Sequence, residues 1–188
     1  DAKWDDARQF AFRLFREHFA EAGLALDTLV AVVDSVQPDV QAFGRELVTR
    51  HFRDEDGPEL LRRVAEHPSP AAQLFATNFL ERYAAGRPER VEGLGHYVRA
   101  VFLQVNRGRV ARRRVIAFLV REGLASERVA RFALGPLASL SASVSVEARA
   151  AAIEALAALG RAWPGLETPL RVVAPAARAA RRPAPEAR

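Results

Sequence analysis

The sequence of 188 residues contains no cysteine, no methionine and only one lysine. The lack of cysteine excludes disulfide bonds and thiolate chemistry, and it fits a reducing compartment, so we expect a cytoplasmic protein. No apolar run approaches the roughly 18 residues of a membrane-spanning helix, so we expect no membrane partner. Hydrophobic residues make up 49% of the chain, which is enough for a sizeable core in one domain or one elongated array.

Arginine supplies 27 of the 28 basic residues. This bias is typical of a GC-rich, bacterial genome, and it lowers the weight of arginine as a binding signal. The charge is uneven, because residues 1–100 carry 13 basic and 17 acidic side chains whereas residues 101–188 carry 15 and 6. An anionic partner would therefore meet the second half of the chain.

One spacing of apolar residues recurs along the chain. A shift of 33 residues superposes Phe10, Ala11, Leu14, Phe15, His18 and Phe19 on Phe43, Gly44, Leu47, Val48, His51 and Phe52. A further shift of 32 residues reaches Phe75, Ala76, Phe79, Leu80 and Tyr83. Two weaker copies follow at shifts of 39 and 37, with Ala111, Val115, Phe118 and Leu119, and then Ala148, Ala152, Ala155 and Leu156. Because these positions are three and four apart, each copy predicts a helix with one buried stripe.

Another short apolar helix is predicted before each of the last four copies, over residues 26–34, 57–67, 88–105 and 126–140. The unit is therefore a helix A, a turn and a helix B, and Pro38 and Pro70 suit the first position of a helix B. Two helices this short cannot bury their stripes alone, so successive pairs must stack. We expect an all-α fold of about nine helices. We expect it to be an α-solenoid of stacked antiparallel helix pairs, with about four and a half repeats.

Three helix-B segments share a finer pattern: "DARQFAFRL" (6–14), "DVQAFGREL" (39–47) and "EARAAAIEAL" (147–156). Each has an acidic residue, a small apolar residue, Arg or Gln, another small residue and then Leu. The pattern resembles the second helix of HEAT-like repeats, which belong to the armadillo-type α-solenoids. Gln41 and Gln73 depart from the arginine that is usual in that family.

The resemblance covers residues 5–163, so we assign residues 1–163 to a HEAT-like array and residues 164–188 to a flexible tail rich in Ala, Pro and Arg. The first copy has no helix A before it, and the chain opens at Asp1 without methionine. We therefore expect the array to be part of a longer one.

The repeat also predicts the core. Eight residues should be largely buried: Phe10, Leu14, Phe43, Leu47, Phe75, Phe79, Phe118 and Leu156. The first helix is also surrounded by four large rings, which are more than one inner stripe needs: Trp4, Phe12, Phe15 and Phe19. Some of these rings should lie exposed or against another chain or domain.

No catalytic, cofactor or metal site is predicted. The sequence contains no phosphate-binding loop, dinucleotide fingerprint, nucleophile elbow or zinc-binding HExxH motif. His18 and His51 hold equivalent positions, but Tyr83 follows them, so the position favours a flat amphipathic ring over a metal ligand. The acidic groups "WDD" (4–6) and "RDEDG" (53–57) pair with no aromatic in the manner of the HEAT-like DNA glycosylases. We expect no enzyme.

The run "NRGRVARRR" (106–114) is the candidate binding site. It places Arg107, Arg109, Arg112, Arg113 and Arg114 at the start of a helix, where the helix dipole disfavours cations. These side chains either reach water or pair with nearby acids such as Glu89 and Glu92, or they bind an acidic protein partner or a nucleic acid. No aromatic residues are interleaved for base stacking, so nucleic acid is the less favoured partner.

A polar row adds one further prediction. Equivalent positions of the five B helices hold Arg8, Gln41, Gln73, Arg112 and Arg149, and we expect hydrogen bonds between repeats along this row. The function that we expect is a non-catalytic repeat scaffold that binds a protein partner. The alternatives are a nucleic-acid-binding protein that uses the basic second half, and a HEAT-like DNA glycosylase. The sequence does not indicate an oligomeric state.

Overall fold

A computed structural model describes residues 2–19, 23–104 and 108–170. These residues form ten α-helices, one short 3-10 helix and no strand, so the fold is all-α as predicted. In chain order the elements are α1 (Asp5–His18), α2 (Leu26–Val33), α3 (Pro38–His51), η1 (Asp54–Asp56), α4 (Gly57–Ala65), α5 (Pro70–Ala84), α6 (Pro88–Gly93), α7 (Gly95–Leu103), α8 (Arg109–Ala125), α9 (Glu127–Ser141) and α10 (Val146–Ala162).

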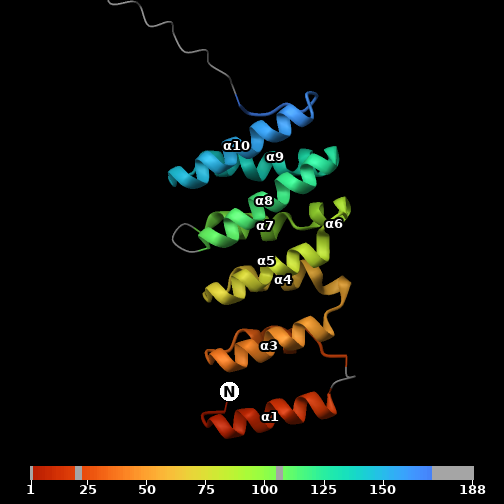
Figure 1. Cartoon of the computed structure of the whole chain (residues 1–188), viewed down its shortest axis with the longest axis vertical. Coiled ribbons are helices and arrows are strands. Elements are labelled where there is room, and N and C mark those ends of the chain that lie inside the picture. Colours follow the sequence, from red (N-terminus) through yellow and green to blue (C-terminus); the bar gives the residue numbers. More distant parts are fainter. Residues whose placement is uncertain (1, 20–22, 105–107, 171–188) are drawn as a thin grey trace, which may run out of the picture.

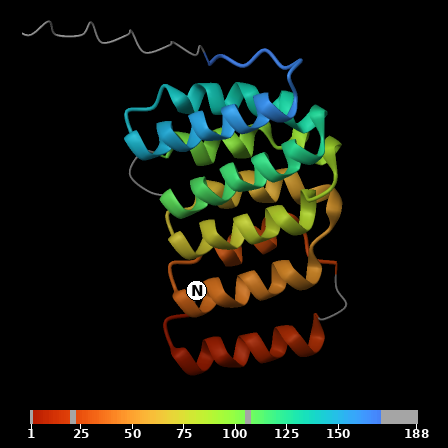
Figure 2. The same ribbon diagram turned by 45° about the horizontal axis from the view of Figure 1, so that its top comes forward.

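The helices follow one another along a single long axis (Figure 1). One row contains α1, α3, α5, α8 and α10, and it lies in front of the others in Figure 2. The second row contains α2, α4, α7 and α9. Contacts run both within and between the rows, since α2 packs on α3, α4 packs on α5 and α7, and α9 packs on α8 and α10.

The apolar stripes meet in one continuous core. Five of the eight predicted core residues are at most 6% exposed: Phe43, Leu47, Phe79, Phe118 and Leu156. Phe75 is half-buried, and its ring centroid lies 5.8 Å from that of Phe79. The three- and four-residue spacing therefore identified the buried side of α3, α5, α8 and α10 correctly.

Gly44 allows the backbones of α2 and α3 to approach each other closely. A Cβ atom built on Gly44 would lie 2.6 Å from the backbone nitrogen of Val33 in α2, which is closer than real Cβ contacts come. The backbones of α2 and α3 therefore touch without an intervening side chain. This contact explains a glycine in the interior of a helix, where it otherwise destabilises by about 1 kcal/mol.

The prediction was wrong for the first helix. Phe10 is 59% exposed and Leu14 is 41% exposed. Phe12 is the buried ring instead, and it stacks on Phe43 with 4.5 Å between ring centroids. The side of α1 that faces α3 is covered, whereas the side that carries Phe10 and Leu14 meets no other described helix. Trp4 and Phe19 are also exposed, as predicted for some of the four large rings around this helix.

Two boundaries also differ from the prediction. The helix predicted over 88–105 is two helices, because the chain turns at Leu94 between Gly93 and Gly95. Within the segment assigned to the tail from residue 164, Leu166 is buried and Leu170 packs against the core. The indole Nε1 of Trp163 also donates to the carbonyl of Gly123 at 2.8 Å. Residues 171–188 lie outside the described part of the chain.

The polar row holds turns within each helix pair, so the predicted ladder between repeats is wrong for its three central members. Gln41 Nε2 donates to the carbonyl of Ser35 at 2.6 Å, and Gln73 Nε2 donates to that of His67 at 2.9 Å. Both carbonyls belong to the turn that precedes the helix of the donor.

The remaining members of the row are Arg112, which is central, and the outer members Arg8 and Arg149. Arg112 donates to the carbonyl of Gln104, in the same manner as Gln41 and Gln73. Arg8 donates to the carbonyls of Ala2 and Lys3 at 3.0 and 3.1 Å, and it also pairs with Asp39 of α3 at 2.7 Å. Only Arg8 therefore reaches the next unit, and Arg149 is exposed without a partner in the described residues.

Two leucines at equivalent positions test the burial of the first helix. Leu47→Ala should lower the free energy of unfolding by about 2 to 5 kcal/mol, because it leaves a cavity in the core. Leu14→Ala should lower it by less than about 1 kcal/mol, because that side chain is already partly in water. Urea denaturation measures both, and equal losses would contradict the difference in burial.

The polar row can be tested in the same way. Gln73→Ala should lower the free energy of unfolding by about 1 to 3 kcal/mol, because it leaves the carbonyl of His67 without its donor. Arg149→Ala, at the equivalent position in α10, should change it by no more than about 0.5 kcal/mol. Thermal melts followed by circular dichroism provide the comparison. A similar loss in both variants would show that the turn bond has no special role.

Candidate functional site

The predicted arginine cluster is dispersed in the structure. Arg107 lies outside the described residues. Arg109 forms an exposed ion pair with Glu147 in α10, with 2.7 Å between Nε and Oε2. Arg114 donates to Thr77 Oγ1 at 3.2 Å and to Asn78 Oδ1 at 2.9 Å, both in α5. These side chains therefore link α8 to the helices on either side of it.

Arg112 and Arg113 complete the described part of the cluster. Arg112 is 8% exposed, it holds the turn at Gln104, and its Nε has no hydrogen-bond partner. Arg113 is exposed and has no partner in the described residues. The hollow beside them, between α8 and α10, measures about 30 Å³, which is room for roughly one water molecule. Glu147 lines the same hollow, so an anion there would face a carboxylate as well as the arginines.

Neither Glu89 nor Glu92 forms an ion pair with the four described arginines of the cluster, which are Arg109, Arg112, Arg113 and Arg114. Glu92 pairs instead with Arg128 of α9 at 2.6 Å, and Arg128 holds the pKa of Glu92 below its ordinary value through that hydrogen bond. Glu147 is the acid that the sequence reasoning missed. Its position at the start of α10, where the helix dipole favours a carboxylate, was the available signal.

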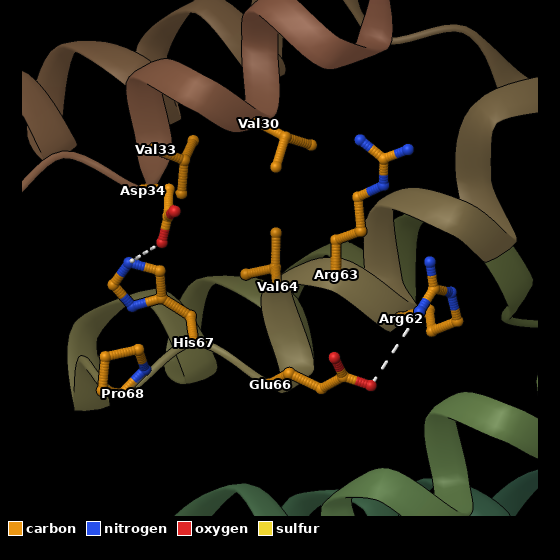
Figure 3. A pocket seen from close by; sticks show the side chains of 9 residues that line it. All are labelled: Val30, Val33, Asp34, Arg62, Arg63, Val64, Glu66, His67 and Pro68. Carbon is orange, nitrogen blue, oxygen red and sulfur yellow. Dashed lines mark ion pairs between the residues drawn. The ribbon is translucent and has the colours of Figure 1, made fainter.

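A pocket of about 320 Å³ lies between α2 and α4 (Figure 3). Its floor is apolar, with Val30, Val33 and Val64, and charged side chains surround it. Most of these charges are neutralised within the chain. Arg63 pairs with Asp27 at 2.6 Å, and Arg62 lies 3.9 Å from Glu66. The pocket therefore offers a ligand little unpaired charge.

His67 closes one side of this pocket, and both of its ring nitrogens are engaged. Nδ1 accepts a hydrogen bond from the backbone N–H of Ser69 at 2.9 Å, so the proton of the neutral ring is on Nε2. Nε2 lies 3.2 Å from Asp34 Oδ1 (Figure 3). This histidine therefore fastens α4 to the end of α2. Across residues 2–19, 23–104 and 108–170, no three His, Asp or Glu side chains gather in a way that could hold a metal ion.

A third hollow, of about 400 Å³, is mainly apolar. It lies between α7 and α9 and continues over the turn after α9. Leu103 is 76% exposed and Val144 is 84% exposed, and both line it. Among the described residues, Arg99 is the only charged residue that lines it, and Arg99 has no partner there. We call this region the α7/α9 hollow, and its full lining is Arg99, Phe102, Leu103, Pro136, Ser139, Leu140, Ala142, Ser143 and Val144.

The sequence reasoning did not identify the α7/α9 hollow. Leu103 and Val144 fall outside the helical stripes. The sequence could have indicated the hollow only because both residues are apolar at positions that need not be buried. The hollow can accept apolar side chains, and Arg99 can pair with a carboxylate beside them.

Comparisons of the chain with known protein families, with curated proteins and with solved structures found no match. In the part of the chain that the structure describes, no helix combines the length and apolar character that crossing a membrane requires.

The charged rim of the pocket between α2 and α4 predicts a pH dependence. Hydrogen bonds from Arg62 and then Arg63 lower the pKa of Glu59 from 4.5 to about 2. A folded-state pKa below the unfolded value stabilises the fold above about pH 4.5, and this stabilisation is lost as the pH falls toward 2. The difference in unfolding free energy between the wild type and Glu59→Gln should therefore shrink over that range. Urea titrations at several pH values measure it, and a constant difference would contradict the role of Glu59.

Proposed function

We propose that this chain is a non-catalytic HEAT-like scaffold, an α-solenoid of about four and a half stacked antiparallel helix pairs that binds a protein partner. The observation that carries the binding proposal is the α7/α9 hollow. Large apolar side chains exposed together on a folded chain favour a protein contact, because their burial against a partner removes apolar surface from water.

Equivalent contacts support the repeat part of the proposal. Gln41, Gln73 and Arg112 each hold the turn before their own helix. Three ion pairs also join residues 36 positions apart: Arg63 with Asp27, Arg90 with Asp54, and Arg128 with Glu92. A recurring offset of about one repeat length is expected when equivalent units stack in the same way.

A nucleic-acid partner is the second candidate, and Arg113 and Arg149 favour it. Both are exposed and unpaired in the described residues, and they lie on neighbouring helices of one row. Two free cations give little affinity, since each phosphate contact adds only one released counterion. Arg109, Arg112 and Arg114 are already engaged within the chain, so the protein partner remains the better supported candidate.

Affinity purification from the cells that express the chain tests the proposal. Leu103→Glu combined with Val144→Glu should reduce recovery of the partner by about tenfold or more, as expected for apolar anchors at the centre of a contact. Val36→Glu is the matched control, because Val36 is 82% exposed in the turn before α3 and far from the hollow in sequence. It should leave recovery unchanged.

Two outcomes would contradict the proposal. In the first, the substitutions at Leu103 and Val144 reduce the recovery of no bound protein. In the second, nuclease treatment removes whatever binds, and Arg113→Glu with Arg149→Glu abolishes binding while the variant of the hollow does not. The second outcome would assign the chain to nucleic acid.

A further inference from the structure

The exposed side of α1 carries a regular set of side chains. Phe10 and Leu14 are 59% and 41% exposed, and Asp6 and Arg13 lie on the same side of the helix. Arg13 has no hydrogen bond or ion pair in the described residues, and Asp6 accepts only from the backbone N–H of Ala7. We call Asp6, Phe10, Arg13 and Leu14 the end face.

Helix α3 shows how the equivalent face is covered inside the stack. The 33-residue shift places Asp6, Phe10, Arg13 and Leu14 on Asp39, Phe43, Glu46 and Leu47. Three side chains of α1, each four residues after the last, contact three members of that face. Arg8 binds Asp39 at 2.7 Å, Phe12 stacks on Phe43 at 4.5 Å, and Arg16 binds Glu46 at 2.7 Å.

The contacts occur in the same residue order along α1 and along α3, so the two helices run parallel. If another helix packs on the end face in the same way, the end face determines which side chains that helix must carry. Asp6 calls for a base as Asp39 does, and Phe10 calls for an aromatic or large apolar side chain as Phe43 does. Arg13 stands where α3 has Glu46, so the third partner must be an acid instead of a base.

We propose that the end face binds one amphipathic helix of a partner protein, parallel to α1, that presents a basic, a large apolar and an acidic side chain four residues apart. The inference rests on the proposed function, because it treats the end face as one more contact between stacked helices.

A second copy of this chain does not supply that helix. The nearest equivalent surface is on α10, where Arg149, Ile153 and Ala157 hold the positions of Arg8, Phe12 and Arg16. Ala157 offers no acid to Arg13. Gly160 lies on the same side of α10 and is covered, since a Cβ atom built there would be 2.9 Å from Thr168 Cγ2. The segment after α10 therefore occupies space that the second copy needs.

A peptide made from α1 itself tests the proposal. Residues 2–18 with Arg16→Glu keep Arg8 and Phe12 and acquire the acid that the end face requires. Phe10→Gln and Leu14→Gln in the peptide prevent it from binding itself. The comparison peptide is identical but retains Arg16, so it suits Glu46 of α3 and is repelled by Arg13. Fluorescence anisotropy measures binding of each labelled peptide to the whole 188-residue chain.

The acidic peptide should bind the wild-type chain about tenfold more tightly than the peptide that retains Arg16, because one ion pair becomes a repulsion. Arg13→Glu in the chain should reverse this preference. Phe10→Ala with Leu14→Ala should abolish binding of both peptides, and Val36→Ala, at an exposed valine outside the end face, should change neither.

Three outcomes would overturn the proposal: no binding, no preference between the peptides, or a preference that survives Phe10→Ala with Leu14→Ala. Sedimentation of the wild-type chain as a dimer that this double variant dissociates would assign the end face to a second copy. The function proposed above fails separately, because it depends on Leu103 and Val144. Loss of peptide binding with retention of a hollow-dependent partner would remove only the present inference.

Discussion

Every helix of this chain depends on its neighbours to bury its apolar stripe. The helices that the structure describes range from 6 to 17 residues, and isolated helices of this length are marginal in water. Contacts from the preceding and the following helices turn separate stripes into one core, in which Leu47, Phe79 and Leu156 are almost completely removed from water. The order of the helices along the axis follows from that requirement.

Two kinds of polar contact fix the geometry of this stack. The buried donors Gln73 and Arg112 fix how each turn meets the next helix, and a buried carbonyl left without a donor is costly. The ion pairs between units are largely exposed, as with Arg128 and Glu92, and exposed pairs contribute little net free energy. These pairs still favour the observed alignment of neighbouring helices, because an alignment that brings like charges together costs free energy.

The sequence predicted most of the fold because the spacing of apolar residues identifies the buried side of each helix. It identified the all-α class, the first position of α3 at Pro38 and of α5 at Pro70, and the buried rings of the central helices. It misplaced the inner side of α1, because the equivalence with α3 assumed neighbours on both sides. Phe12 and Phe10 look alike in the sequence, and only the position of α3 decides which of them is buried. The break at Leu94 was missed for a similar reason, since two flanking glycines permit a turn without requiring it.

The candidate site was less predictable than the fold. A run of arginines in the sequence suggests one patch, but a helix directs successive side chains to different sides, and Arg109, Arg112 and Arg114 reach three different partners. The α7/α9 hollow depends on Leu103 and Val144, which are 41 positions apart in the sequence and carry no motif. Proximity of this kind arises only from packing.

Helix α1 packs on α3 through one side only, and this determines how the chain unfolds locally. An inner helix such as α8 packs against α5, α7, α9 and α10. In contrast, α1 is held on α3 by the stacking of Phe12 on Phe43 and by the ion pairs of Arg8 and Arg16. Amide protons in α1 therefore exchange through a smaller fluctuation than those in α8 or α9, which are packed from several directions. Helix α1 can therefore detach from α3 and expose its amides to exchange while the rest of the core stays ordered.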